Sequence, residues 1–304
     1  MTDKKVRALI QNDEVTIVKK PRKSIYGKVI YYLVGAAISL CFIFPVLYMF
    51  AASTKSQELI AQHDGTLLMF LPDFAHLDHF FDNYATLFTE HHVGRYALNS
   101  LIYAAISIVL NILINGLAAY AICKLRFPGK RFFNAIIMFL IIVPVETSII
   151  PLLTICKNML NLKGDFQLLG IILPSAISVF NIFLFIQFFS SIPKAFEEAA
   201  RMDGASTIQI FFKVILPLSK PIIATVAVFC FIGVWNDYLW PTMILTKDEF
   251  LPVQAALTTI KDTPGVEPGH VMASLVTASI PIFIVYIAAQ RYIVKGFGAG
   301  GLKL

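Results

Sequence analysis

The sequence predicts an all-α polytopic membrane protein with six transmembrane helices. Of its 304 residues, 57% are apolar and only 14% are charged, and the mean hydropathy is +0.73. About a quarter of the residues in a typical soluble domain are charged, so this chain lacks the residues needed to cover a water-facing surface. Six near-continuous apolar stretches are each long enough for a membrane-spanning helix of roughly 20 residues. Continuous stretches favour helices over barrel strands, in which apolar side chains alternate.

The first apolar stretch could be a cleaved signal peptide or a retained span. Its apolar core, residues 29–50, is longer than the roughly 7–15 residues of a signal peptide, so we expect it to be retained. The predicted spans then cover residues 29–52, 98–123, 132–155, 168–189, 221–245 and 271–294.

The distribution of basic residues predicts the orientation of these spans. Nineteen of the 25 lysines and arginines fall on one side of the six-span arrangement, and this excess marks the cytoplasmic side. Both termini are therefore expected in the cytoplasm, and the net charge of +6 indicates attraction to anionic lipid rather than to nucleic acid. The expected parts are a basic cytoplasmic segment at 1–28, a six-helix transmembrane domain at 29–294 with external loops at 53–97 and 246–270 and a cytoplasmic loop at 190–220, and a cytoplasmic tail at 295–304.

Part of the cytoplasmic loop, residues 193–217, reads PKAFEEAARMDGASTIQIFFKVILP. Pro193 and the carboxylates of Glu197 and Glu198 suit the first turn of a helix, and the alanines that follow favour helix with little bulk. Gly204 permits a sharp turn before an amphipathic second half. This pattern predicts two short helices that offer small residues and a carboxylate to another protein. On physical grounds alone, an amphipathic loop that only joins two spans is equally open.

The segment resembles the EAA loop of ABC importer permeases: Glu-Ala-Ala, three residues, Gly, nine residues, Ile, one residue, Leu-Pro. Glu198, Gly204 and Pro217 fall at this spacing, and Val214 replaces the isoleucine. Residues 235–241, WNDYLWP, resemble the W-N-[DE]-[FY]-x-W-P signature in the fifth span of sugar-importer permeases. The ending QRYIVKGFGAGGLKL is similar to the tail of the smaller permease of maltose-type importers.

The resemblance implies a MetI-like ABC importer permease fold and a non-catalytic role as one of two unlike permease subunits. The implied partners are a larger permease, two cytoplasmic ATP-binding subunits, an extracytoplasmic solute-binding protein and a sugar. External loop 246–270 would face the binding protein, and the EAA loop would dock in a cleft of one ATPase. The residues implied in this coupling are Glu197, Glu198, Ala199, Ala200, Asp203, Gly204, Leu216 and Pro217.

Polar residues within the predicted spans are candidates for a substrate pathway. An ionised side chain at a helix centre costs ~2.5–3.5 kcal/mol on insertion scales, so we expect such residues to serve transport or helix packing. They either line a polar pathway or fix helix packing by hydrogen bonds, and Asn111, Asn115 and Asn181 are expected to do the latter. The pathway candidates are Glu146, Trp235, Asn236, Asp237, Tyr238 and Trp240.

Catalytic, cofactor and metal sites are not expected in this chain. No G-x-x-x-x-G-K-[ST] loop is present, so ATP would be bound by another subunit. His76, His79, His91 and His92 invite a zinc hypothesis, but no cysteine accompanies them and a solvated loop is favoured. An ion-coupled secondary transporter using Glu146 or Asp237 is the alternative function. Such folds commonly contain inverted repeats, and none is evident between residues 29–155 and 168–294.

Overall fold

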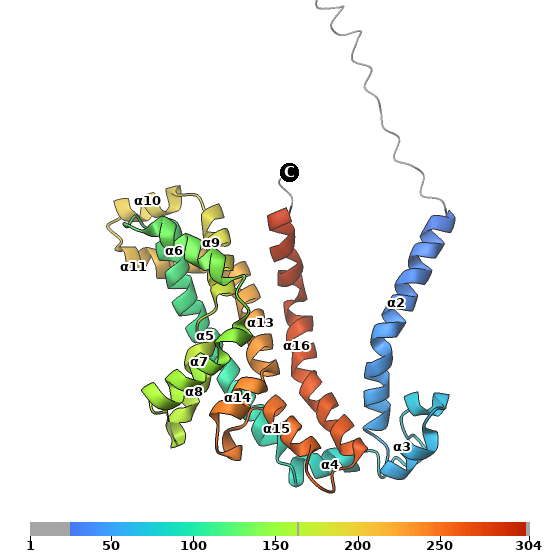
Figure 1. Ribbon diagram of the computed structural model, residues 1–304. Coiled ribbons are helices and arrows are strands. Elements are labelled where there is room, and N and C mark those ends of the chain that lie inside the picture. The colour runs from blue at the N-terminus through green and yellow to red at the C-terminus, as the bar shows by residue number, and fades with distance from the viewer. Residues whose placement is uncertain (1–24, 163, 302–304) are drawn as a thin grey trace, which may run out of the picture. The chain divides into compact units, whose positions relative to one another are not determined.

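The structure is a computed structural model that describes residues 25–162 and 164–301, and every element in these ranges is a helix (Figure 1). The chain divides into two units, Met1–Leu47 and Tyr48–Leu304. Helix α2 (Ile25–Ala52) begins in the first unit and ends in the second. Most of the predicted basic segment 1–28 lies outside the described residues.

Three of the described helices are long and apolar enough to cross a membrane singly, namely α2, α5 (Val93–Lys124) and α16 (Pro268–Gly301). Up to three more spans are formed by bent pairs. The bend angles are 103° for Lys130–Leu140 with Val145–Met159, 41° for Gly164–Ser175 with Val179–Ser191, and 83° for Thr207–Leu218 with Lys220–Asn236. The prediction of a helical protein with several spans is confirmed, and the third predicted span, 132–155, falls on the pair that is bent most sharply.

The bent pairs and the connecting segments consist of shorter elements. Their bounds are α3 (Gln57–His63), η1 (Leu67–Phe70), α4 (Asp82–Thr89), α6 (Lys130–Leu140), η2 (Val145–Ser148), α7 (Ile149–Thr154), η3 (Ile155–Met159), η4 (Gly164–Phe166), α8 (Gln167–Ser175), α9 (Val179–Ser191), α10 (Ala195–Met202), α11 (Thr207–Ile210), η5 (Phe211–Ile215), α12 (Leu216–Leu218), α13 (Lys220–Asn236), α14 (Leu239–Ile244), η6 (Asp248–Phe250) and α15 (Val253–Lys261).

Proline explains the break in the third predicted span. Pro144 precedes η2 with extended backbone, and proline lacks the N–H that would continue the ladder of α6. Backbone groups freed inside a membrane must find partners within the protein.

At the break between α8 and α9, side chains of α5 donate hydrogen bonds to the backbone carbonyls that the break leaves free. Asn111 Nδ2 donates to the carbonyl of Ser175 at 3.2 Å, and Asn115 Nδ2 donates to that of Ala176 at 3.3 Å. Asn181 Nδ2 of α9 donates to Asn111 Oδ1 at 2.9 Å. The predicted interhelical role of these three asparagines is confirmed.

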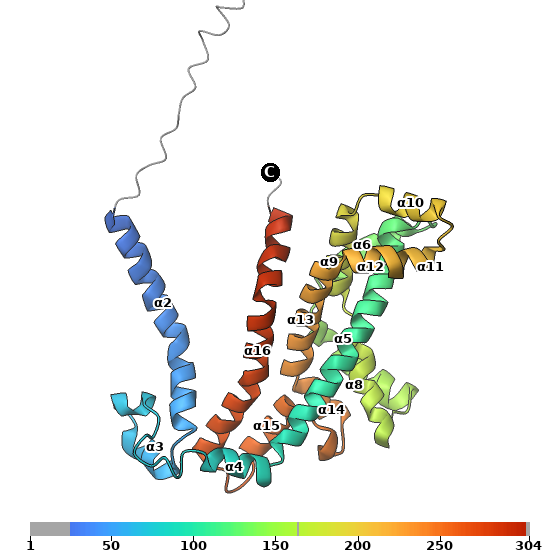
Figure 2. The ribbon, with the colours of Figure 1, turned by 180° about the vertical axis from the view of Figure 1, so that it is seen from behind.

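Within the unit Tyr48–Leu304, the loops gather at opposite ends. Both views place α10 and α11 at one end and α4 and α15 at the other (Figures 1 and 2). Buried clusters support both ends: Phe185, Phe211 and Ile215 belong to the cluster beside α10 and α11, and Leu87 and Val253 belong to a cluster formed by α4, α5, α13, α15 and α16.

Candidate coupling loop and translocation motif

The glycine of the loop ends helix α10 by a complete Schellman motif. Gly204 has φ +79°, its N–H donates to Arg201 O at 3.0 Å, and the N–H of Ala205 donates to Ala200 O at 2.9 Å. This pattern satisfies the last carbonyls of a helix and requires a left-handed residue. The Glu-Ala-Ala-x-x-x-Gly spacing therefore describes one short helix and its stop.

The chain then re-enters a helix whose inner face is buried. Ser206 and Gln209 form a capping box at the start of α11, with Ser206 N donating to Gln209 Oε1 at 2.8 Å. Such a box satisfies two otherwise free N–H donors. Ile210, Phe211 and Ile215 are fully buried, so the second half of the loop is fixed to the helix bundle by apolar packing.

Two adjacent glutamates of α10 have opposite environments. Glu197 is buried, and its Oε1 lies 2.9 Å from Nζ of Lys124, the last residue of α5. Lys124 Nζ also donates to the carbonyl of Ile192, which ends α9, at 2.8 Å. Glu198 is exposed. Glu197 therefore joins α10 to α5 and α9, and Glu198 is free to face a partner.

The outer face of the loop is small, acidic and accessible. Ala199, Asp203 and Gly204 are exposed along with Glu198, as is Pro217, whereas Ala200 and Leu216 are half-buried. A shallow groove of about 480 Å³ runs between α10 and Val214 and is lined by Ala199, Ala200 and Asp203. Of the predicted coupling residues, Ala199, Ala200 and Asp203 thus line one groove, and Glu198, Gly204 and Pro217 are accessible.

The WNDYLWP motif contains two buried anchors. Trp235, in the last turn of α13, is fully buried, and its Nε1 donates to Ala278 O of α16 at 3.0 Å. Trp240 in α14 donates from Nε1 to Gly170 O of α8 at 2.8 Å. The two indoles belong to different buried clusters. The motif therefore fixes the break between α13 and α14 to two other helices.

Four consecutive residues lie between these anchors, and they are the accessible part of the motif. Asn236, Tyr238 and Leu239 are exposed and Asp237 is half-buried. Asp237 Oδ1 accepts a hydrogen bond from Trp240 N at 3.2 Å, so this carboxylate also caps the start of α14. Of the six pathway candidates, the structure leaves Asn236, Asp237, Tyr238 and Glu146 accessible.

Glu146 belongs to the bent third span. It lies in η2, directly before α7, and is exposed. The next element, α7, contacts both η2 and α14, so it links the element that carries Glu146 to the element that follows Asp237.

Comparison with known proteins identifies the chain. The family described as "Binding-protein-dependent transport system inner membrane component" matches residues 116–298. The chain belongs to this family. It is a multi-pass inner-membrane permease of the ABC transport type, and the family predicted from the EAA loop and the WNDYLWP motif is confirmed.

Curated relatives of this permease span nearly the whole chain. It is 31% identical over 272 residues to the "Arabinooligosaccharides transport system permease protein AraQ" of Halalkalibacterium halodurans, covering 88% of this chain and 94% of that protein. It is 33% identical over 263 residues to the "sn-glycerol-3-phosphate transport system permease protein UgpE" of Yersinia pestis, covering 84% and 91%.

Solved structures confirm the fold of the permease. A chain of a bacterial ABC transporter "involved in the import of the acidic polysaccharide alginate" superposes with a TM-score of 0.76 at 31% identity, covering 89% of this chain and 97% of that one. A chain of the MetNI methionine ABC transporter gives a TM-score of 0.50 at 17% identity, covering 67% and 95%. The MetI-like fold predicted for the permease is thereby confirmed.

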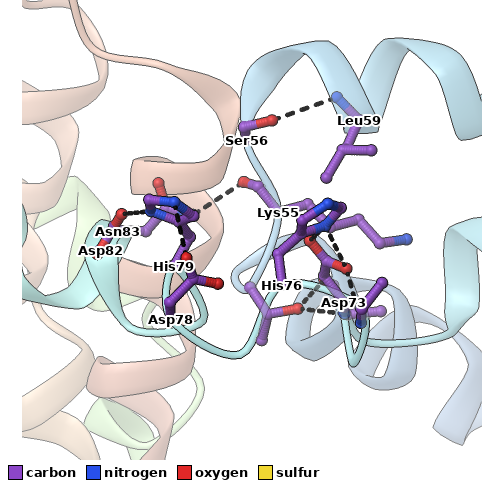
Figure 3. Close-up of polar contacts among 12 residues, drawn as sticks. Lys55, Ser56, Leu59, Asp73, His76, Asp78, His79, Asp82 and Asn83 are labelled. Carbon is purple, nitrogen blue, oxygen red and sulfur yellow. Dashed lines mark hydrogen bonds and ion pairs between the residues drawn. The ribbon is translucent and has the colours of Figure 1, made fainter.

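In the histidine-rich loop 53–97 of this permease, His76 and His79 form local ion pairs (Figure 3). His79 lies 2.7 Å from Asp82 and 3.2 Å from Asp78, and the hydrogen bond to Asp82 raises the His79 pKa above its usual value. His76 pairs with Asp73 at 3.0 Å. In the part of the chain that the structure describes, no group of three or more His, Cys, Asp or Glu residues is placed to hold a metal ion.

The same loop is held together by Asn83 and a buried lysine. Asn83 Nδ2 donates to the carbonyls of Ser53 and Lys55, both at 2.9 Å. Lys55 Nζ donates to Leu68 O at 2.8 Å, and burial lowers the Lys55 pKa. Gly269 in the first turn of α16 approaches so closely that an added Cβ would lie 2.7 Å from Asn83 Nδ2. Loop 53–97 is therefore ordered by its own hydrogen bonds and by the start of α16.

Sequence reasoning missed the partner of Glu197. Lys124 counted only as one of the basic residues that predict orientation, because nothing in the spacing of Lys124 and Glu197 shows that they meet. The one available hint was that Lys124 is a basic residue at the end of a long apolar span.

Proposed function

We propose that this permease is one of two unlike membrane subunits of an ATP-driven, binding-protein-dependent importer of sugars or sugar derivatives. Membership in the binding-protein-dependent family supports the transport class. The substrate class is supported by relatives that are named for arabinooligosaccharides and sn-glycerol-3-phosphate, and by the neighbour described for alginate. The partners would be a larger permease, two cytoplasmic ATP-binding subunits and an extracytoplasmic solute-binding protein.

The observation that carries the proposal is the two-sided construction of residues 193–217. The inner side is fixed to the bundle by Phe211, Ile215 and the Glu197–Lys124 pair. The outer side presents Glu198 beside a groove of small residues. A segment built in this way transmits a force applied to its outer face into α5, α9 and α13, because its inner contacts are packed and cannot slide freely.

The mechanism requires the outer face to bind a partner whose shape depends on nucleotide. A ligand shifts a conformational equilibrium only by its differential affinity for the two states. We infer that closure of the ATP-binding subunits moves the docked loop, which would lie on the cytoplasmic side together with both termini. ATP hydrolysis takes place on those subunits, and this chain has no catalytic or cofactor role.

The accessible residues of the WNDYLWP break form the proposed pathway. Asn236, Asp237 and Tyr238 offer an amide, a carboxylate and an aromatic ring, which suit a hydroxyl-rich solute. Trp235 and Trp240 act through position, because their rings are buried and their N–H groups are bonded to backbone carbonyls. Glu146, exposed in η2, is a further candidate for this pathway.

Uptake by the reconstituted complex tests the proposal. We expect accumulation of sugar in vesicles to require ATP on the cytoplasmic side and the binding protein on the other, and to persist when ion gradients are dissipated. Uptake by this chain without any ATPase, or uptake driven by a proton gradient, would instead establish the secondary transporter that uses Glu146 or Asp237.

A further inference from the structure

Three basic side chains line one cavity at the junction of α5 and α6. The cavity has a volume of about 650 Å³, and its lining includes Arg126, Lys130 and Arg131. Lys130 Nζ donates to the carbonyls of Cys123 and Leu125 at 2.9 and 3.2 Å, so it caps the end of α5. This leaves the two guanidinium groups to determine what the cavity attracts.

No carboxylate neutralises these two arginines within the described residues. Both are exposed, and neither forms an ion pair in residues 25–162 and 164–301. The buried carboxylate at this end of the bundle, Glu197, binds Lys124 instead. Arginine forms paired hydrogen bonds with phosphate oxygens, so the cavity suits a phosphate group better than a neutral ligand.

The rest of the lining makes the cavity amphipathic. Asn134 and Ser190 add an amide and a hydroxyl to its polar side, whereas Ile122, Phe127 and Ile186 form an apolar wall. An inorganic phosphate ion would leave this wall unused. A phospholipid would place its phosphodiester against the arginines and its glycerol and first methylenes against the wall.

The position of the cavity also agrees with a lipid. It lies where α5 ends and α6 begins, beside the end of α9, and the side chains that follow Arg131 are exposed aromatics, Phe132 (65%) and Phe133 (50%). Aromatic side chains are typical of the boundary between hydrocarbon and water. In the proposed topology this is the cytoplasmic boundary, where anionic headgroups attract basic residues.

We propose that this cavity binds the headgroup of an anionic phospholipid, such as phosphatidylglycerol or cardiolipin, through Arg126 and Arg131. The proposal depends on the cytoplasmic placement given under the proposed function. Its site is distinct from the outer face of residues 193–217, and none of its lining residues belongs to the proposed docking surface.

Lipid retention tests the site directly. The assembled transporter is purified in mild detergent from membranes that contain phosphatidylethanolamine, phosphatidylglycerol and cardiolipin, and bound lipid is measured by mass spectrometry. We expect the natural complex to retain anionic lipid above its membrane fraction and the double variant Arg126→Gln, Arg131→Gln to lose at least fivefold of it. The control, Lys28→Gln with Lys220→Gln, removes the same charge from exposed positions outside the cavity and outside residues 193–217 and should retain the lipid. Equal retention by both variants would overturn the proposal.

A second measurement uses the cysteine in the cavity lining and needs no change to the arginines. Cys123 lines the cavity, and Cys41, Cys156 and Cys230 are replaced by alanine. We expect labelling of Cys123 by a soluble maleimide to be severalfold slower in phosphatidylglycerol nanodiscs than in phosphatidylcholine nanodiscs. Equal rates would contradict the lipid site, and slowing by inorganic phosphate in phosphatidylcholine would indicate a free-ion site instead.

The two proposals fail in different ways. Labelling of Cys123 from outside the cell would contradict the topology of the proposed function. Cytoplasmic labelling that is equally slow in both nanodiscs and becomes fast only when the ATP-binding subunits are removed would assign the cavity to a protein contact and leave ATP-driven transport intact.

Discussion

The proposed coupling loop 193–217 and the break at 235–241 both place a buried residue directly beside an exposed one, but the buried residue is held by different interactions. In the loop, Glu197 is buried by an ion pair and Glu198 is exposed. In the break, Trp235 is held by an indole bond to a carbonyl and Asn236 is exposed. A charge pair resists displacement of a segment at the membrane surface, whereas uncharged anchors suit a break within the membrane, where a charge is costly.

The largest effect should come from placing a charge on the outer face of the loop. Gly204→Asp should abolish uptake and co-purification of the ATP-binding subunits, because it places a charge on the docking face. The chain should remain in the membrane, because no atom lies within 4 Å of the added Cβ and Asp tolerates left-handed backbone. Gly204→Ala, which adds strain of about 1–2 kcal/mol but no charge, should keep partial uptake. Normal uptake and co-purification of Gly204→Asp would refute docking at this face.

The two glutamates of α10 should differ in stability. Glu197→Gln leaves the buried Lys124 unpaired, which costs about 3–5 kcal/mol, so thermal unfolding of the complex should occur at a lower temperature. Glu198→Gln, at an exposed position, should change stability by less than about 0.5 kcal/mol and reduce uptake alone.

A double variant sharpens this comparison. Glu197→Leu with Lys124→Met removes both charges, and replacing a whole buried pair by apolar residues is often neutral. Recovered stability would support the ion pair as the interaction that fixes α10 to α5. Unchanged stability of Glu197→Gln itself would show that another interaction fixes these helices.

The tryptophans of the break should affect stability more than transport affinity. Trp240→Phe leaves the buried carbonyl of Gly170 without its donor, at a cost of about 1–3 kcal/mol, and Trp235→Phe removes the indole bond to Ala278 O. Melting of the purified complex measures both. Tyr238→Ala, at the exposed position between them, is the matched control and should leave melting unchanged. A variant of either tryptophan with altered sugar affinity and normal melting would place its ring in the pathway.

The smallest effect is expected at Asp237. Asp237→Asn keeps an oxygen for the N–H of Trp240 and removes only the charge, so assembly should be normal. The half-saturation constant for sugar uptake should change about fivefold, the equivalent of one hydrogen bond worth about 1 kcal/mol. Asp237→Ala loses the cap as well and should show the same change in affinity. If uptake kinetics are unchanged in both variants, Asp237 serves packing.

Much of this fold follows from patterns within single segments of the sequence. Apolar runs predicted the helices, and Pro193, the alanines and Gly204 predicted the two-helix loop, because a helix start and stop depend on local backbone geometry. The structure differs where long-range contacts decide. Periodicity could not show that Pro144 bends the third span by 103°, nor that Trp235 and Trp240 are buried against other helices.

The pairing of Lys124 with Glu197 was hidden for the same reason. These residues are far apart in the chain, and each alone has an ordinary explanation, as a topology signal or as a charge in the first turn of a helix. Only packing of α10 against the end of α5 gives them a common role.

Accessibility of the loop tests the central claim most directly. Met202 is 88% exposed at the end of α10, so a Met202→Cys variant in a chain without native cysteines can be labelled by an impermeant maleimide. Lys220→Cys at the exposed start of α13 serves as the control. We predict that Met202→Cys is labelled only from the cytoplasmic side and is protected when the ATP-binding subunits are assembled, while Lys220→Cys stays reactive. Labelling from outside, or equal labelling of Met202→Cys with and without those subunits, would contradict the account.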